Sequence, residues 1–129
     1  MGIRVFDIEE ECIRVPIISD DARFVVGPHT GAEVATLNYV ILQPGEENEP
    51  HDHPYSEDTI FCLHGEGEAV DVTNNFSKKV VANSVIHVPP GVEHTVRSTG
   101  DEPMISIGGP CPPHLEVLEQ FGLDLEENG

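Results

Sequence analysis

Short apolar or β-branched runs alternate along the chain with clusters of turn-forming residues, and this alternation most constrains the fold. Runs of this length are typical of strands. Clusters such as Gly27-Pro28, Pro44-Gly45 and Pro89-Pro90-Gly91 can reverse the chain between them. The pattern predicts strands at residues 13–18, 24–26, 34–42, 59–63, 69–72, 79–81, 85–88, 94–97 and 104–107.

Such spacing, with no helices between the strands, favours an all-β sandwich or small barrel over parallel βαβ units. One short helix is predicted near the C-terminus, at about residues 113–122, because Leu115, Leu118 and Phe121 follow Pro113 at helical spacing. A length of 129 residues allows one domain, 1–129.

Charge excludes some partners. The chain has 24 Asp and Glu against 6 Lys and Arg, for a formal net charge of -18. Nucleic-acid binding and anionic membrane surfaces both require Lys and Arg, so neither is expected as a partner. No apolar run approaches the length of a membrane helix, and residues 1–11 are acidic where a secretory signal would be basic. We therefore expect a soluble, cytoplasmic protein.

The acidity has two interpretations. Lysine occurs only at Lys78 and Lys79, and an acid-rich, lysine-poor surface suits a protein that works in high salt. The alternative is ordinary solubility through net charge. The three cysteines, Cys12, Cys62 and Cys111, are widely spaced and form no CxxC pair. They are typical of free thiols in a reducing compartment.

The most informative stretch is residues 45–65. His51 and His53 flank one residue, and in an extended segment side chains two apart leave the same face, so both imidazoles can reach one cation. A turn after His53 could return the carboxylate of Asp58 beside them, while Glu57 would face the other way. His94, after a Pro-Pro-Gly turn, starts a strand that could pair across from this stretch. Three imidazoles and a carboxylate suit one divalent transition metal.

These residues resemble the two motifs of the cupin family. Gly45, His51, His53, Asp58 and Gly65 match the first motif, with Asp58 in place of the usual Glu. Pro89, Gly91 and His94 match the second, with Asn83 where the family has Gly and Ser98 where it has Asn. The resemblance implies a double-stranded β-helix, or jelly-roll barrel, with its core at about residues 34–107 and additional N-terminal strands within residues 1–33.

The resemblance also implies a metal site and a homodimer. His51, His53 and His94 correspond to the family's histidine ligands, and Asp58 to its glutamate. Aspartate is one methylene shorter, so Asp58, Glu57 or neither is the fourth ligand. Iron is the metal we favour, with manganese, nickel, copper or zinc as alternatives.

Other residues are candidates for contact with a substrate. Cys62 would point inward together with Asp58 and Ile60 if the strand alternates. Tyr39 and Tyr55, the only tyrosines, could orient a substrate or supply a proton. Arg97 could hold a carboxylate. For each of them, packing or surface pairing is the alternative.

The leading functional hypothesis is a non-haem iron dioxygenase that acts on a small metal-chelating substrate. The first alternative is a non-redox metal-dependent isomerase, lyase or decarboxylase. The second is a non-catalytic module that binds a metal or a small ligand.

Overall fold

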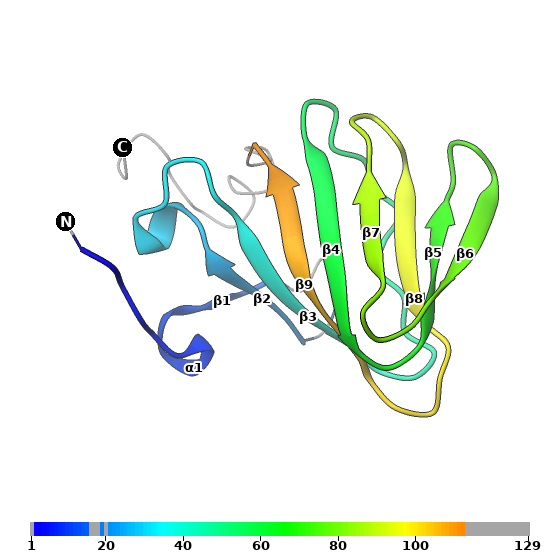
Figure 1. Cartoon of the computed structure of the whole chain (residues 1–129), viewed down its shortest axis with the longest axis horizontal. Coiled ribbons are helices and arrows are strands. Elements are labelled where there is room, and N and C mark those ends of the chain that lie inside the picture. Colours follow the sequence, from blue (N-terminus) through cyan, green and yellow to red (C-terminus); the bar gives the residue numbers. More distant parts are fainter. Residues whose placement is uncertain (1, 16–18, 20, 113–129) are drawn as a thin grey trace.

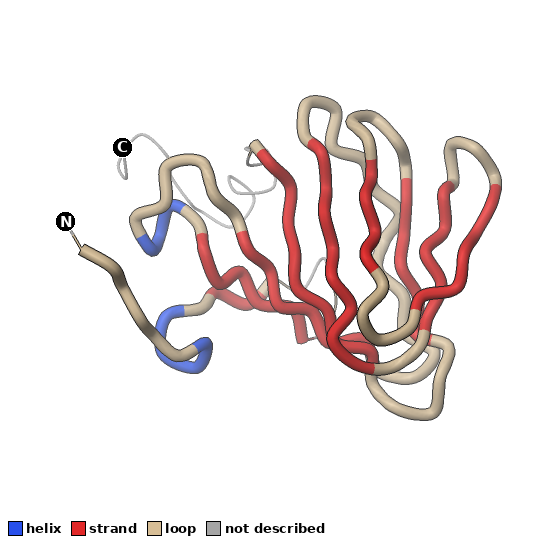
Figure 2. Tube along the Cα trace, viewed as in Figure 1, coloured by secondary structure: helices blue, strands red, loops and turns tan. Residues whose placement is uncertain are grey.

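A computed structural model describes residues 2–15, 19 and 21–112 of the chain. Within them the fold is almost entirely β (Figures 1 and 2). The strands are β1 (Ile13–Arg14), β2 (Asp21–Val26), β3 (Leu37–Leu42), β4 (Glu57–His64), β5 (Gly67–Asp71), β6 (Phe76–Val80), β7 (Val85–Val88), β8 (His94–Ser98) and β9 (Met104–Cys111).

Each strand overlaps one of the predicted runs, so the all-β prediction is confirmed. The sequence pattern missed two short helices, α1 (Ile8–Glu11) and the 3-10 helix η1 (Pro28–Thr30). The predicted C-terminal helix at 113–122 lies outside the described residues. None of the described helices is long and apolar enough to cross a bilayer.

The strands form a longer and a shorter antiparallel sheet. The longer sheet has the order β1-β2-β3-β9-β4-β7, and the shorter one the order β6-β5-β8. β7 and β6 are therefore edge strands of their respective sheets. Many neighbours are distant in sequence, as where Tyr39 of β3 pairs with Ile107 of β9. This is the pairing of a jelly roll, in which residues from both halves of the chain form one sheet.

The main core lies where the inner faces of the two sheets meet. Its buried side chains come from both sheets: Leu42, Cys62, Val80, Val96 and Met104. Val40, Ile60 and Ile86 pack against them. In β4 the buried residues alternate with exposed ones, so Asp58 and Cys62 face inward while Phe61 and Leu63 face outward.

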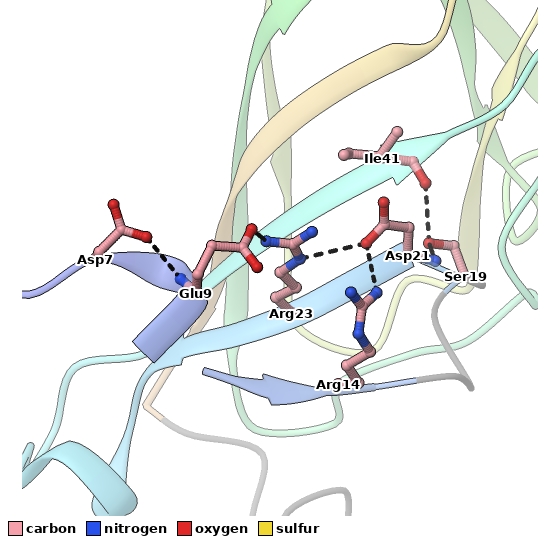
Figure 3. Close-up of polar contacts among 7 residues, drawn as sticks. All are labelled: Asp7, Glu9, Arg14, Ser19, Asp21, Arg23 and Ile41. Carbon is pink, nitrogen blue, oxygen red and sulfur yellow. Dashed lines mark hydrogen bonds and ion pairs between the residues drawn. The ribbon is translucent and has the colours of Figure 1, made fainter. Parts of the chain in front are cut away.

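Ion pairs attach the N-terminal segment to the longer sheet (Figure 3). Arg23 of β2 pairs with Glu9 of α1 and also contacts Asp21 through Nε at 3.3 Å. These contacts raise the pKa of the Arg23 guanidinium despite its burial, with the hydrogen bond to Glu9 as the largest cause. Asp7 caps α1 by accepting a hydrogen bond from the Glu9 amide at 2.8 Å. The segment therefore lies on the β1-β2 side of the fold, away from the shorter sheet.

Candidate metal centre

The segment that carries the HxH pair lies along the outer edge of β8. His51 and His94 form an isolated antiparallel bridge, with each amide donating to the other's carbonyl at 3.0 and 2.9 Å. Earlier in the segment, Asn48 Oδ1 accepts from Thr95 Oγ1 and from the Val96 amide, both at 2.8 Å. Residues directly opposite in an antiparallel pair have adjacent side chains. This pairing therefore places His51 next to His94.

β4 supplies the carboxylate. After His53 the chain turns at Pro54 and Tyr55, where the Ser56 amide donates to the His53 carbonyl at 3.4 Å. The strand then begins at Glu57, and its alternation points Asp58 inward at 6% exposure. Asp58 Oδ2 lies 3.4 Å from His53 Nε2 and 3.5 Å from His94 Nε2. The turn predicted between the histidines and the carboxylate is thus present.

The four side chains converge on one point. One donor atom from each of His51, His53, Asp58 and His94 lies within 4.8 Å of the others. Four donors at about 2.0–2.2 Å from one ion lie up to roughly 4.4 Å apart, slightly closer than this. All but His51 are buried, and the His51 ring centroid lies 4.3 Å from that of His94. The arrangement suits a divalent metal, and small side-chain rotations would bring the donors into contact with it.

Backbone carbonyls orient two of the imidazoles. His51 Nδ1 lies 2.8 Å from the Glu49 carbonyl, and His94 Nδ1 lies 2.9 Å from the Val92 carbonyl. A carbonyl only accepts, so in each neutral ring Nδ1 carries the proton and donates it. The Nε2 atoms are left with a free lone pair, which is the state in which histidine binds a metal.

The charges of the cluster depend on burial and on the carboxylate. Burial lowers the pKa of His51 to about 4, so this ring is neutral at pH 7. Burial also opposes charge on Asp58, but hydrogen bonding to His53 and His94 outweighs it and holds the Asp58 pKa well below its usual range. For His94, burial acts against the charged form, yet Asp58 and the Val92 carbonyl raise its pKa.

Two buried atoms in the cluster are poorly satisfied. Asp58 Oδ1 makes no hydrogen bond to any of the residues the structure describes, and His94 Nε2 has only its 3.5 Å contact with Asp58 Oδ2. Buried polar atoms without partners are costly and uncommon in folded proteins. A cation between the four side chains would satisfy both atoms, so the donor set fits a divalent metal.

Positive backbone φ angles explain the glycines of the two motifs. Gly45, Gly65 and Gly91 have φ values of 85°, 90° and 78°, a region that residues with a Cβ rarely adopt. Asn83, which replaces a motif glycine, has φ 76°. Asparagine tolerates this conformation better than most residues do. The departure from the motif therefore keeps the local backbone shape.

The remaining candidates do not join the cluster. Glu57 faces outward, where its carboxylate lies 2.8 Å from His87 Nε2, so the structure places Asp58 and not Glu57 beside the histidines. Arg97 faces away from His94 on β8, with Nε 3.7 Å from a Glu47 carboxylate oxygen. The structure therefore shows the charge pair with a nearby acid that was the alternative to substrate binding for Arg97.

The other three candidates also lie elsewhere. Tyr55 is 88% exposed. Tyr39 lies on the opposite face of β3 from Val40, which packs on the core. Cys62 faces inward as expected but belongs to the core at 0% exposure, and burial raises the pKa of its thiol. It packs in the core as a small apolar residue does.

Sequence reasoning missed a cavity beside the cluster. A space of about 430 Å³ lies between the sheets, lined by residues of β5, β6, β7 and β8 that include His94 and Lys78. Strand alternation in β6 accounts for the inward position of Lys78. Val80 is buried, and side chains two residues apart in a strand share a face, so Lys78 also faces inward. The predicted run at 79–81 was too short to reveal that phase.

Comparison with known proteins places this geometry in a family. The Cupin domain family matches residues 38–107. Polyketide synthase CurC of Streptomyces cyaneus is 32% identical over 83 residues, which cover 64% of this chain and 53% of that protein. Germin-like protein 1-1 of Oryza sativa subsp. japonica is 34% identical over 76 residues, which cover 57% of this chain and 34% of that protein. The chain thus spans about half of the first relative and about a third of the second.

Solved structures agree on the fold. The polyketide cyclase RemF from Streptomyces resistomycificus superposes with a TM-score of 0.70 at 21% identity, over 87% of this chain and 80% of that one. A protein with a double-stranded beta-helix domain from Klebsiella pneumoniae gives a TM-score of 0.67 at 22% identity, covering 88% and 92%. The family match extends over more than half of the chain and includes all four clustered side chains, and the protein therefore belongs to the cupin family.

Proposed function

We propose that the protein is a metal-dependent enzyme that acts on a small molecule, with one divalent transition metal held by His51, His53, Asp58 and His94. The observation that carries this proposal is the convergence of four donor atoms within 4.8 Å, beside a cavity of about 430 Å³. Cavities of this size accommodate small organic ligands.

Iron is the metal we favour. Imidazole nitrogens suit iron, copper, nickel and zinc, and a carboxylate adds an oxygen donor that iron and manganese accept well. Four protein donors leave up to two of six octahedral positions for a substrate. When bound, iron would supply redox chemistry with O2, and zinc or nickel would polarise a substrate carbonyl.

The chain's own residues would position the substrate and limit water. His94 borders the cavity and connects the donor set to it. Apolar side chains from both sheets, including Ile86, Val88 and Val96, line the same space. A substrate whose oxygens chelate the metal would have its apolar part packed against these side chains. Exclusion of water would strengthen the electrostatic interactions at the donor set.

An O2-dependent dioxygenase is the reaction class that we put first. The histidine-rich set with one carboxylate supports it, together with an apolar cavity that shields reactive species from water. A non-redox reaction, such as cyclisation, isomerisation, lyase action or decarboxylation, is the second candidate. The third candidate is a non-catalytic module that binds a metal or a small ligand at this site.

The deciding experiment combines metal analysis with exchange of the metal. The purified protein is analysed for bound metal, stripped with a chelator, and reloaded separately with Fe(II), Mn(II), Ni(II) and Zn(II). Each form is incubated with small diketones, catechols and thiols under air and under nitrogen. The dioxygenase proposal expects O2 consumption with Fe(II) only, and loss of that consumption in a His94→Ala variant.

Other results would select a different class. Substrate conversion by the Zn(II) form under nitrogen would replace the dioxygenase with the non-redox reaction. If the protein binds one metal per chain and also binds a ligand, but converts none of the substrates, the result would favour the non-catalytic binding module. Failure of the stripped protein to bind any of the four metals would contradict the metal-dependent proposal as a whole.

A further inference from the structure

The shorter sheet presents three rows of side chains on its inner face. Because β5 pairs with β6 and β8 in continuous register, each row has one residue from each strand. The innermost row is Val80, Gly67 and Ser98, the middle row is Lys78, Ala69 and Val96, and the outer row is Phe76, Asp71 and His94. Val80 and Val96 belong to the buried core, which fixes this face as the inward one.

Lys78 is therefore a cation on the same face as His94. It lies in the row next to His94, two strands away, which corresponds to a separation of roughly 10–12 Å between the two backbone positions. Both residues line the 430 Å³ cavity, and Lys78 is on the edge strand β6, where it is exposed at the rim. A lysine side chain extends about 6 Å, enough to reach a molecule bound between the two.

The other charged groups at the cavity are already engaged. The Asp71 carboxylate accepts from the Asn74 amide and side chain at 2.8 and 2.9 Å. His87 contacts Glu57, and Lys79 Nζ lies 3.9 Å from a Glu66 carboxylate on the outer face. In the described part of the chain, no carboxylate pairs with Lys78 within 4.0 Å. The nearest acid on this face, Asp71, lies diagonally across from Lys78, but its carboxylate oxygens accept from Asn74 and form no ion pair with the lysine.

We infer that Lys78 holds a negatively charged group of the substrate, so that the site selects molecules with a metal-chelating end, an apolar body and an anionic far end. This inference rests on the proposed function, since the chelating end needs the metal. The apolar body would pack on Ala69, Ile86 and Val88, which line the same cavity as His94 and Lys78. Lys78 is a specificity residue, because it binds the substrate at a distance from the reacting atoms.

Two matched probes test this inference. 2-Oxoadipate and 2-oxohexanoate share the same chelating 2-oxo acid end, and only the first has a carboxylate at the far end. Dissociation constants are measured by calorimetry on protein loaded with Zn(II) or Ni(II), which avoids any turnover with O2. We expect wild-type protein to prefer 2-oxoadipate by about tenfold, a preference typical of one charge-assisted hydrogen bond.

Variants at two neighbouring lysines separate specificity from general charge. Lys78→Ala should abolish the preference, and Lys78→Arg should retain most of it. Lys79→Ala is the matched control: Lys79 also borders the cavity, but its Nζ lies 3.9 Å from a Glu66 carboxylate oxygen, so its removal should leave the preference intact. Metal content of every variant is measured first and should equal that of wild type, since Lys78 is not among the donors.

The inference and the proposed function fail in different ways. A protein that takes up no metal contradicts the proposed function. A metal-loaded protein that binds both probes equally, or binds neither, overturns the assignment of Lys78 alone. The same holds if Lys79→Ala removes the preference as fully as Lys78→Ala, because the effect would then come from net charge.

Discussion

Asp58 and Glu57 are adjacent carboxylates with opposite environments. Asp58 is buried at 6% exposure beside His53 and His94, while the Glu57 side chain is 59% exposed and pairs with His87. The difference follows from strand alternation alone, which sends neighbouring side chains to opposite faces. The sequence pattern contained both residues, and only the phase of β4 assigns one of them to the cluster.

Replacing Asp58 should weaken metal binding. Asp58→Asn keeps the size of the side chain but removes the negative charge, so we expect metal affinity to fall by about tenfold or more. The measurement is calorimetric titration of metal-free protein with Zn(II). Glu57→Gln is the control that removes the same charge from the outer face and should bind as wild type does. Equal affinities for Asp58→Asn and wild type would mean that the three histidines bind the metal without the carboxylate.

The histidines of the metal-free protein should titrate in a defined order. Burial lowers the pKa of His51 to about 4, whereas Asp58 raises the pKa of His94 above 6.5. Imidazole titrations followed by NMR should show His94 protonating before His51 as the pH is lowered. In Asp58→Asn the His94 pKa should fall. The reverse order, or an unchanged His94 in this variant, would contradict the arrangement of charges described above.

Because the pKa of His94 is raised and that of His51 is lowered, the two residues contribute to the stability of the folded protein in different pH ranges. A raised pKa means that the folded protein holds the His94 proton more tightly than the unfolded chain does. Its contribution is fully present below about pH 6.5 and is lost as the pH rises through the folded pKa. For His51 the pKa is lowered, so its contribution is present above pH 6.5 and is lost as the pH falls towards 4.

At the scale of elements, the register of the longer sheet depends on a glycine. Gly108 of β9 lies against β4, and a Cβ at this position would approach the Thr59 carbonyl oxygen to 2.0 Å and the Ile60 Cα to 2.8 Å. Both contacts are with backbone, which cannot move aside as a flexible side chain would. β4 is the strand that carries Asp58, so close approach here helps to fix the position of the site.

Gly108→Ala should therefore be strongly destabilising. We expect a loss of about 2 kcal/mol or more in the free energy of unfolding, because the two strands must separate to admit the methyl group. The control is Gly45→Ala, where φ is 85° but no atom lies within 4 Å of the added Cβ. Conformational strain alone should cost about 1 kcal/mol there. Urea denaturation compares them, and equal losses would argue against the close contact.

The elements also show where sequence reasoning is sufficient. All nine described strands were predicted, because apolar runs and turn residues are local signals. The boundaries differ by up to four residues, as at β9, which continues to Cys111 beyond the predicted Ile107. The run there contains Gly108, Gly109 and Pro110, which read as a loop but pair with β4. Tertiary pairing overrides the local preference.

At the scale of the whole molecule, the net charge of -18 should make stability depend on salt. Salt screens the repulsion between like charges at the surface, so we expect the melting temperature to rise by roughly 5 °C or more between about 0.1 M and about 2 M KCl. A variant with Glu10, Glu33 and Asp101 changed to the corresponding amides should melt higher at low salt and respond less. A melting temperature that does not rise with KCl would contradict adaptation to high salt.

The oligomeric state stays a prediction. We expect a homodimer, and sedimentation velocity at two protein concentrations tests it directly. A single species with the mass of two chains at both concentrations would support the dimer. A species at 14.1 kDa throughout would contradict it and show that one chain contains the complete site.

The sequence by itself determined the family, the strands and the three histidines of the candidate site, because each depends on residue types at fixed local spacings. His51 and His53 share a face through their spacing alone, and the motif glycines occupy left-handed backbone positions that their lack of a Cβ permits. Tertiary structure decided which acid joins the histidines and which candidate residues face away from them. It also placed Lys78 across a cavity from His94, since strand phase and the packing of two sheets depend on contacts between residues far apart in the chain.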